Sequence, residues 1–269
     1  MTDQSINIPT VQMTRQLRHF IASGFRQVYR FFAFHWEILR RAVRPPYYGA
    51  TVWEQMDRIG VDSLSIVMLV GFFTGFVLAF QTGYAMMRFG AKIYVGGIVA
   101  VSLVRELGPV LIAMVFAGRV GAGITAELGA MQVSEQIDAM RALATDPLRK
   151  LVLTRVMASV AMLPVLVVIG DLVGIAGGML VGVMNLGLTA NFYRSSVVNA
   201  LVFNDLFSGL VKPVVFGFMI SMVACYYGLT TSGGTKGVGE AVTRTVVVSS
   251  VLIFLLDAVI TKLLFLVGM

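Results

Sequence analysis

The sequence predicts an all-α integral membrane protein, in which an N-terminal amphipathic interfacial helix is followed by five transmembrane helices. Of the 269 residues, 57% are hydrophobic and only 13% are charged, whereas a typical soluble domain carries about 25% charged residues. Uncharged apolar runs cover residues 63–87, 172–193 and 213–235. Each run reaches the roughly 20 residues that a helix needs to cross a bilayer. We therefore expect a chain that crosses the membrane several times.

The positive charge of the chain lies beside its apolar runs, which argues against nucleic-acid binding. The formal net charge is +7, with eight of the 21 basic residues before position 60 and four more between 141 and 155. Basic residues that flank spans on one side are typical of the cytoplasmic face of a membrane protein. We therefore predict a cytoplasmic N-terminus and a C-terminus on the far side, where Arg88, Lys92, Arg194 and Lys212 are expected.

Few patterns in the sequence point to catalysis. The only histidines are His19 and His35, and the single cysteine, Cys225, lies inside an apolar run. No metal-ligand spacing, nucleotide-binding loop or catalytic triad is recognisable. The glycine-rich stretch 232–239 lacks the spacing of a phosphate-binding loop and is predicted to be a flexible turn. We expect the chain to catalyse no reaction by itself, and its first 60 residues show no pattern of a signal peptide.

An amphipathic basic helix is predicted over residues 11–44, because apolar side chains recur along one helical stripe and the arginines lie largely off it. The stripe consists of Leu17, Phe20, Ile21, Gly24, Val28, Phe31, Phe32, His35 and Leu39. Such a helix lies in the membrane interface, with packing on the protein's own flank as the alternative. Pro45 and Pro46 end it, and a second amphipathic segment, 53–62, follows. We therefore separate an interfacial region, residues 1–62, from a transmembrane domain, residues 63–269.

Glycines in two of the predicted spans indicate close helix packing. The first span, 63–87, contains Gly71 and Gly75 four residues apart, a spacing that lets membrane helices approach closely. The third span begins after Asp146 and Pro147, which are predicted to be its N-cap and first helical residue. This span repeats glycine every fourth residue, at Gly170, Gly174, Gly178 and Gly182, beside Asp171. The fourth and fifth spans are predicted over 206–230 and 246–267, the last carrying Asp257 and Lys262.

The second span is too long to be a simple transmembrane helix. It extends from Val95 to Glu127, about 50 Å at 1.5 Å per residue, whereas the hydrocarbon core is only about 30 Å thick. Pro109 gives it a reason to kink, because proline donates no backbone hydrogen bond and its ring crowds the carbonyl four residues earlier. That carbonyl belongs to Arg105, so the helical ladder is expected to be broken there.

Arg105 and Glu106 are the strongest candidates for a functional site. A charge in mid-membrane costs roughly 3 kcal/mol on insertion scales, and neighbouring helical residues point about 100° apart. At least one of the two should therefore face another helix, a water-filled cavity or a polar ligand. An interhelical salt bridge or a snorkelling arginine is the structural alternative. For Arg119 and Glu127, further along the span, we favour a structural role.

A short polar helix is predicted between the second and third spans, over Ser134–Leu143. Ser134 is a plausible N-cap with Glu135 in the first turn, and Ile137, Met140 and Ala144 form a small apolar face. A helix of this length is marginal by itself. It is either a solvated linker or a docking helix for a cytoplasmic partner.

Four stretches of the sequence closely resemble the MlaE-type (YrbE-type) permease family of ABC transporters. They are LVRELGPVLIAMVFAGRVGAGITAELGAM, SEQIDAMRALATDPLRKLVLTR, KPVVFGFMISMVACYYG and GVGEAVTRTVVVSS. The resemblance covers nearly the whole chain after about residue 40. It implies a homodimeric, multi-pass permease of the bacterial inner membrane that moves phospholipid to or from a periplasmic carrier and maintains outer-membrane lipid asymmetry. It also implies an ABC ATPase subunit that binds ATP and Mg²⁺, a hexameric MCE-domain protein, often accompanied by a STAS-domain subunit, and no cofactor in this chain.

The resemblance also assigns roles to residues. The segment at about 133–145 looks like the coupling helix that sits in a groove of the ATPase, through Glu135, Gln136, Ile137, Asp138, Met140 and Arg141. Arg105 and Glu106 match the charged pair near the lipid cavity between the protomers. By helical spacing, Leu78, Met86 and Phe89 could line that cavity with acyl-contact surface. Arg88 and Lys92 depart from the family pattern in the turn after the first span.

Two other classes of function stay open at this point. A self-contained secondary transporter or channel for an amphiphilic solute would need ion-coupling groups and often shows internal repeats, but no repeat is visible and five spans do not divide into halves. A non-transporting scaffold is the third possibility, and a response of ATP hydrolysis to lipid would separate it from a permease.

Overall fold

The structure, a computed structural model, describes residues 29, 31–41 and 48–266. The chain divides into two compact units, residues 1–46 and 47–269, and each is described by itself. In the first unit, residues 31–41 are helical. The rest of the predicted helix over 11–44, together with Pro45 and Pro46, lies outside the described residues. The placement of this helix in the membrane interface therefore stays a prediction.

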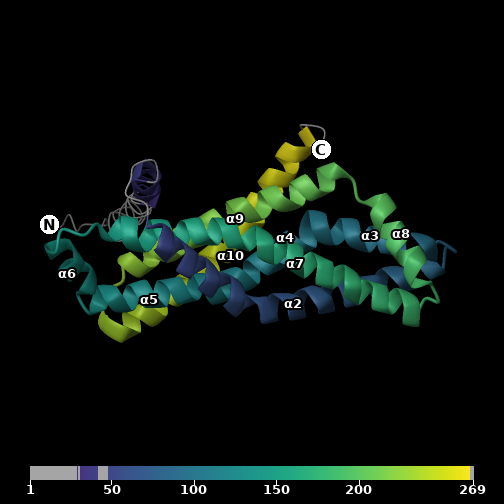
Figure 1. Cartoon of the computed structure of the whole chain (residues 1–269), viewed down its shortest axis with the longest axis horizontal. Helices are drawn as coiled ribbons and strands as arrows, with labels where there is room; N and C mark the ends of the chain where they lie inside the picture. Colours follow the sequence, from purple (N-terminus) through teal and green to yellow (C-terminus); the bar gives the residue numbers. More distant parts are fainter. Residues whose placement is uncertain (1–28, 30, 42–47, 267–269) are drawn as a thin grey trace, which may run out of the picture. The chain divides into compact units, whose positions relative to one another are not determined.

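The second unit is a bundle of five helical spans joined by short connections. Its spans are α2 (Gly49–Met87), the interrupted helix Lys92–Val133, the helix Leu148–Met184, α9 (Phe203–Leu229) and α10 (Gly234–Leu266). All five are long and apolar enough to cross a membrane, and no strand occurs in the described part of the chain. The predicted all-α membrane fold is confirmed. Two short helices, α6 (Gln136–Ala142) and α8 (Ala190–Ala200), lie at opposite ends of the bundle (Figure 1).

The second span is a helix with two π-helical turns in it. After the short 3₁₀ turn η1 (Lys92–Tyr94) it consists of α3 (Val95–Ser102), η2 (Leu103–Leu107), α4 (Gly108–Phe116), η3 (Ala117–Gly121) and α5 (Ala122–Val133), of which η2 and η3 are π-helical. The predicted break at Arg105 is confirmed, because η2 ends immediately before Gly108 and Pro109. Single π-turns in α-helices are frequent at functional sites. A third π-turn, η4 (Leu148–Leu153), precedes α7 (Thr154–Met184).

Glycine allows α2 and α7 to touch backbone to backbone. A Cβ on Gly75 would lie 1.8 Å from the carbonyl oxygen of Gly174, and one on Gly71 would lie 2.4 Å from that of Gly170. The predicted close approach is confirmed, and its partner helix is now known. The other half of the α7 glycine stripe accommodates Tyr193 of α8, whose hydroxyl would be 2.6 Å from a Cβ on Gly178. Burial raises the pKa of Tyr193 to about 12, so its hydroxyl stays protonated.

Several predicted element boundaries need correction. The amphipathic segment 53–62 and the first span form one continuous helix, α2. The stretch 232–239 is not a flexible turn, because α10 starts at Gly234. The turn is confined to Gly233 and Gly234, with φ of 90° and 69°, a backbone conformation that glycine adopts without strain. The predicted N-cap is confirmed, since Asp146 Oδ1 accepts a hydrogen bond from the Leu148 amide at 3.1 Å.

The contact between α2 and α7 predicts a marked effect of the substitution Gly75→Ala. The methyl group would meet the Gly174 backbone, which cannot rotate away, so the two helices must separate. Overpacking of this kind costs about 1–3 kcal/mol, and the melting temperature of the purified protein should fall. Gly239→Ala is the matched control, because a Cβ there meets nothing within 4 Å. An equal melting temperature for both variants would contradict the close contact.

Candidate functional site

Two ion pairs join the middle of the second span to α9. The guanidinium of Arg105 donates to Asp205 Oδ1, and Lys212 Nζ lies 2.6 Å from Glu106 Oε2. Asp205 and Lys212 are seven residues apart, so they occupy the same face of α9 two turns from each other. Two neighbouring residues of η2 with opposite charge therefore reach two partners of opposite charge on a single helix.

Lys212 is the most enclosed charge of this network. Its side chain is 0% exposed, and three oxygens lie within 3.0 Å of its Nζ, from Glu106, from Asp257 of α10, and from the backbone carbonyl of Arg105. Pro109 has no N–H group to donate to the Arg105 carbonyl. The ammonium group of Lys212 donates to this carbonyl instead. Glu106 is held further by Thr261 of α10, whose Oγ1 donates to Oε1 at 3.2 Å.

The two members of each pair differ in exposure. The side chains of Arg105 and Glu106 are 33% and 42% exposed, whereas those of Asp205 and Lys212 are 3% and 0% exposed. Arg105 and Glu106 therefore reach the surface of the chain while their partners lie inside. The interhelical salt bridge, which was the structural alternative at both positions, is present, and each pair still presents one charged group outward.

The partners of the charged pair were missed from sequence. Lys212 was assigned to the far-side face of the membrane, but it lies buried within α9. Asp205, Asp257 and Thr261 were not connected to Arg105 or Glu106. A signal was present, because Lys212 and Asp257 are isolated charges in otherwise apolar runs and such charges usually pair with one another. In the described part of the chain, no group of three or more His, Cys, Asp or Glu side chains could hold a metal ion.

The three predicted acyl-contact residues are not equivalent in the structure. Leu78 and Met86 are partly buried against an apolar cluster that includes Val95, Val99 and Tyr193. Phe89, in the turn after α2, is 79% exposed. Two of the three therefore make part of their contacts with the protein's own core, and their role in lipid contact stays a prediction.

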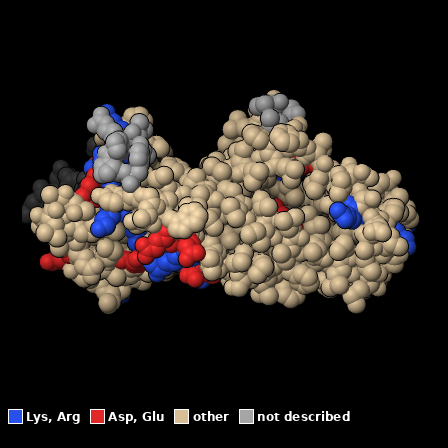
Figure 2. Space-filling view, in the orientation of Figure 1, with Lys and Arg blue, Asp and Glu red and all other residues tan. Residues whose placement is uncertain are grey.

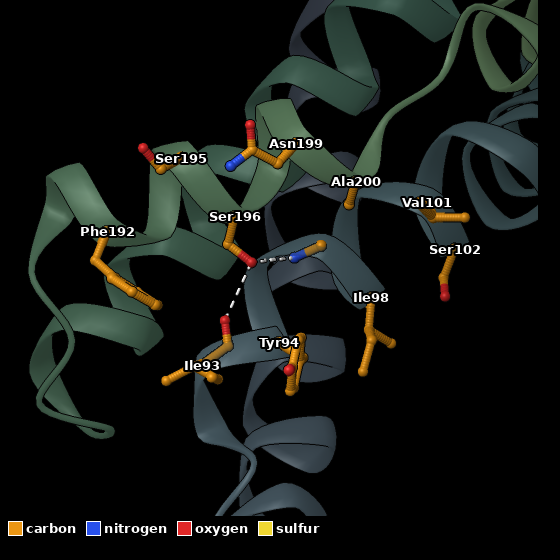
Figure 3. A pocket seen from close by; sticks show the side chains of 11 residues that line it. Ile93, Tyr94, Ile98, Val101, Ser102, Phe192, Ser195, Ser196, Asn199 and Ala200 are labelled. Carbon is orange, nitrogen blue, oxygen red and sulfur yellow. Dashed lines mark hydrogen bonds between the residues drawn. The ribbon is translucent and has the colours of Figure 1, made fainter.

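A groove of about 630 Å³ opens between α3 and α8. It is lined by Ile93, Tyr94, Gly97, Ile98, Val101, Ser102, Phe192, Ser195, Ser196, Asn199 and Ala200 (Figure 3). Ser196 ties its two walls together, because its Oγ donates to the Ile93 carbonyl and accepts from the Gly97 amide, both at 3.1 Å. Ser102 is the last residue before η2, so the groove ends three residues before Arg105 in the chain, and neither Arg105 nor Glu106 lines it. Leu78, Met86 and Phe89 do not line it.

The predicted short helix between the second and third spans exists as α6, but it begins differently. Ser134 is not its N-cap, because its Oγ donates to the Ala130 carbonyl at 2.8 Å and so belongs to the end of α5. Serine hydroxyls readily bond the carbonyl four residues earlier. The residue before α6 is Glu135, with φ of 59°. This left-handed conformation is uncommon outside glycine and turns the chain sharply from α5 into α6.

α6 exposes mainly polar and charged side chains. Ile137 is 0% exposed and anchors the helix, and Met140 is half-buried. Ala144 lies beyond the helix end and is exposed, so the predicted apolar face is smaller than expected. The remaining residues assigned to coupling, which are Glu135, Gln136, Asp138 and Arg141, are exposed, and Asp138 pairs with Arg141 at 2.7 Å.

A second ion cluster joins α5 and α7, the helices before and after α6, and includes one residue of α2. Glu127 of α5 is 3.0 Å from Arg155 of α7 and 3.6 Å from Arg58 of α2. The Arg155 side chain is only 4% exposed and also donates to the Leu151 carbonyl at 2.8 Å. These contacts agree with the structural role favoured for Glu127. On the face shown in Figure 2, charged side chains gather towards this end of the bundle, and the middle is almost free of them.

Comparison with known proteins gives one family. The model of the family described as "Permease MlaE" matches residues 52–263. The chain is 46% identical over 223 residues to a probable ABC transporter permease protein of Rickettsia typhi, covering 83% of this chain and 86% of that protein. It is 38% identical over 213 residues to the intermembrane phospholipid transport system permease protein MlaE of Haemophilus influenzae, covering 79% and 82%. It is also 38% identical over 229 residues to the chloroplastic protein TRIGALACTOSYLDIACYLGLYCEROL 1 of Arabidopsis thaliana, covering 85% and 65%.

The buried ammonium predicts that Lys212→Met destabilises the bundle. The change leaves Glu106 and Asp257 without their cation, and breaking a buried pair costs about 3–5 kcal/mol. The melting temperature in detergent should fall clearly. It should recover in part when Asp257→Asn is added, because one uncompensated carboxylate is then removed. Lys262→Met, at an exposed position of α10, is the control. A Lys212→Met protein as stable as the control would mean that the network does not hold the helices together.

Proposed function

This chain belongs to the MlaE permease family, and from that premise we propose that it is the membrane subunit of an ATP-driven ABC transporter for phospholipid or a related lipid. It moves the lipid between the bacterial inner membrane and a periplasmic MCE-domain carrier, and so maintains outer-membrane lipid asymmetry. The observation that carries the proposal is the outward exposure of Arg105 and Glu106 in the middle of an apolar span. A phospholipid transport permease is among its relatives, at 38% identity.

The site fits the headgroup of an amphiphile. A guanidinium can bind a phosphate through two parallel hydrogen bonds, and Arg105 uses its Nε for Asp205, which leaves other donors on the exposed part of its side chain. Asp205 already fixes the Arg105 side chain, so the arginine loses little conformational freedom when it binds a headgroup. Half-exposed charges in a span are costly in hydrocarbon, and a headgroup beside them relieves that cost.

The acyl chains of the lipid would contact apolar surface around this site. Leu78, Met86 and Phe89 are the proposed contacts in a cavity between two copies of the chain. The groove between α3 and α8 ends at Ser102, the residue before η2, and it offers further apolar surface towards the α8 end of the bundle. We propose a homodimer, and α10 offers a surface for it, because only 11% of its most apolar stretch is buried within the chain. Its bare face would be covered by lipid or by the second copy.

The energy would come from a separate subunit. We propose that α6 docks in a cytoplasmic ABC ATPase, which binds ATP and Mg²⁺, while this chain holds no cofactor. The buried Ile137 fixes α6 to the bundle, and the exposed charges of Glu135, Asp138 and Arg141 are available to the partner. The N-terminus and α6 then share the cytoplasmic side, as the clusters of basic residues suggest. The groove end of the bundle faces the hexameric MCE-domain protein, and a STAS-domain subunit can complete the assembly.

Charge reversal on α6 tests the docking. Glu135→Lys with Asp138→Lys changes two exposed side chains, and the surface pair of Asp138 with Arg141 is worth at most about 1 kcal/mol, so the fold should persist. The ATPase should no longer co-purify, and ATP-dependent lipid transfer should be lost. Glu54→Lys with Asp57→Lys is the control, because these residues have the same spacing and are also exposed on a helix. Unchanged co-purification and transfer would refute the coupling role.

Removal of the exposed positive charge of Arg105 tests the proposed lipid binding. Arg105→Met is combined with Asp205→Asn, so that no buried carboxylate is left without its cation. The variant should keep its melting temperature within a few degrees but carry much less phospholipid on purification, as measured by mass spectrometry. Arg244→Met, at an exposed position of α10, controls for the loss of one positive charge. The same phospholipid content in both variants would mean that Arg105 has a structural role only.

A further inference from the structure

The network of paired charges leaves one carboxyl group unexplained. Asp171 of α7 is 8% exposed, and its Oδ1 is buried without a hydrogen-bond partner. It lies in a span, beside the glycine stripe that packs on α2. A buried polar group without a partner is costly, so its retention needs a reason.

Gly108 leaves the space that this carboxyl occupies. A Cβ on Gly108 would lie 1.8 Å from Asp171 Oδ1 and 2.9 Å from the backbone carbonyl oxygen of Leu103. The two oxygens therefore border the same small space at the junction of η2 and α4. The Leu103 carbonyl already accepts from the Gly108 amide, but a carbonyl oxygen has a second lone pair. An acceptor is thus available beside the carboxyl group.

No cation is assigned to this carboxyl by the surrounding elements. The helix α4, the helix α3 and the part of α2 beyond Asp62 contribute no charged side chain. The cations of η2 and α9, Arg105 and Lys212, are paired with Asp205, Glu106 and Asp257. The nearest titratable groups on α8 are Tyr193 and Arg194, and the Tyr193 hydroxyl faces Gly178, about two turns along α7 from Asp171. An ionised carboxylate in this place would be uncompensated, and burial of such a charge is strongly unfavourable.

We propose that Asp171 is a proton-binding site: its carboxyl group is held as the neutral acid and donates its O–H to the Leu103 carbonyl. The bond fixes the first residue of η2, the turn that carries Arg105 and Glu106. Asp171 is then a positioning residue for the charged pair, acting from α7, whereas the ion-pair partners of the two residues lie on α9. The proton stays on the carboxyl group throughout. Only the consequence for lipid binding rests on the proposed function, because the protonation and the hydrogen bond concern this chain alone.

Infrared spectroscopy of the purified full chain tests the protonation directly. A protonated carboxyl group gives a carbonyl stretching band separate from the amide bands, and this band shifts in D₂O. We expect such a band at neutral pH in the parent protein and its loss in Asp171→Asn. Asp257→Asn, which changes a carboxyl group that has a cation partner, should leave the band in place. A parent spectrum identical to that of Asp171→Asn would overturn the proposal.

Two substitutions at Asp171 test the positioning role. Asp171→Asn keeps a donor for the Leu103 carbonyl, whereas Asp171→Leu has a similar size and no donor. Hydrogen exchange in peptides covering 103–108 should be about fivefold faster in Asp171→Leu, as expected for the loss of one ordinary hydrogen bond, and close to the parent rate in Asp171→Asn. Co-purified phospholipid should fall with Asp171→Leu and stay at the parent level with Asp171→Asn.

Equal exchange in all three proteins, or equally fast exchange in both variants, would refute the hydrogen bond. If Asp171→Leu does not fold, the infrared band and the exchange rate of Asp171→Asn still decide. If the parent protein carries no phospholipid, the proposed function fails while the infrared and exchange measurements remain decisive for Asp171.

Discussion

The bundle depends on the enclosure of one ammonium group. Lys212 of α9 places its ammonium group inside the bundle, and the oxygens that surround it come from the second and fifth spans. Separation of any of these helices would leave that charge in an apolar environment, which is far more costly than the loss of ordinary side-chain contacts. The same group bonds the carbonyl that Pro109 leaves free, so the proline is tolerated where it would otherwise weaken the helix. Stability and the irregular backbone of the second span thus have a common origin.

The arrangement separates anchoring charges from presented charges. Asp205 and Lys212 lie inside the bundle, where Asp205 binds the Nε of Arg105 and Lys212 binds the Oε2 of Glu106. The side chains of Arg105 and Glu106 themselves stay partly exposed at the surface. A flexible arginine would lose much rotamer freedom on binding a ligand, whereas one that is already fixed loses little. The π-turn serves the same purpose, because it brings two adjacent residues with opposite charge towards partners on one helix. The irregular backbone is therefore part of the candidate site.

The sequence was informative wherever the cause of a feature is local. Apolar run length predicted the five spans, the four-residue glycine spacing predicted a close approach, and Pro109 predicted the broken ladder at Arg105. It was uninformative where the cause is a contact between distant segments. The partners of Arg105 and Glu106 lie about a hundred residues away. Lys212 and Asp257 stand out as charges in apolar runs, but their positions in the sequence do not indicate which charges pair. Ser134 and the stretch 232–239 were mistaken for another reason, because the same residue types favour both helix caps and turns. The groove between α3 and α8 could not be foreseen, since neither helix contains it alone.

The contact between Glu127 and Arg155 has a mechanical consequence. α5 delivers the chain into α6, and η4 and α7 carry it away, so these helices are the two arms on which α6 is mounted. The two arms are joined by an ion pair, in which the Glu127 carboxylate of α5 lies 3.0 Å from the almost fully buried Arg155 guanidinium of α7. If one arm tilted without the other, Arg155 would lose its counter-ion inside the protein. A displacement of α6 would therefore be transmitted to the second and third spans together, through an ion pair that lies more than a full turn along α5 from the short helix.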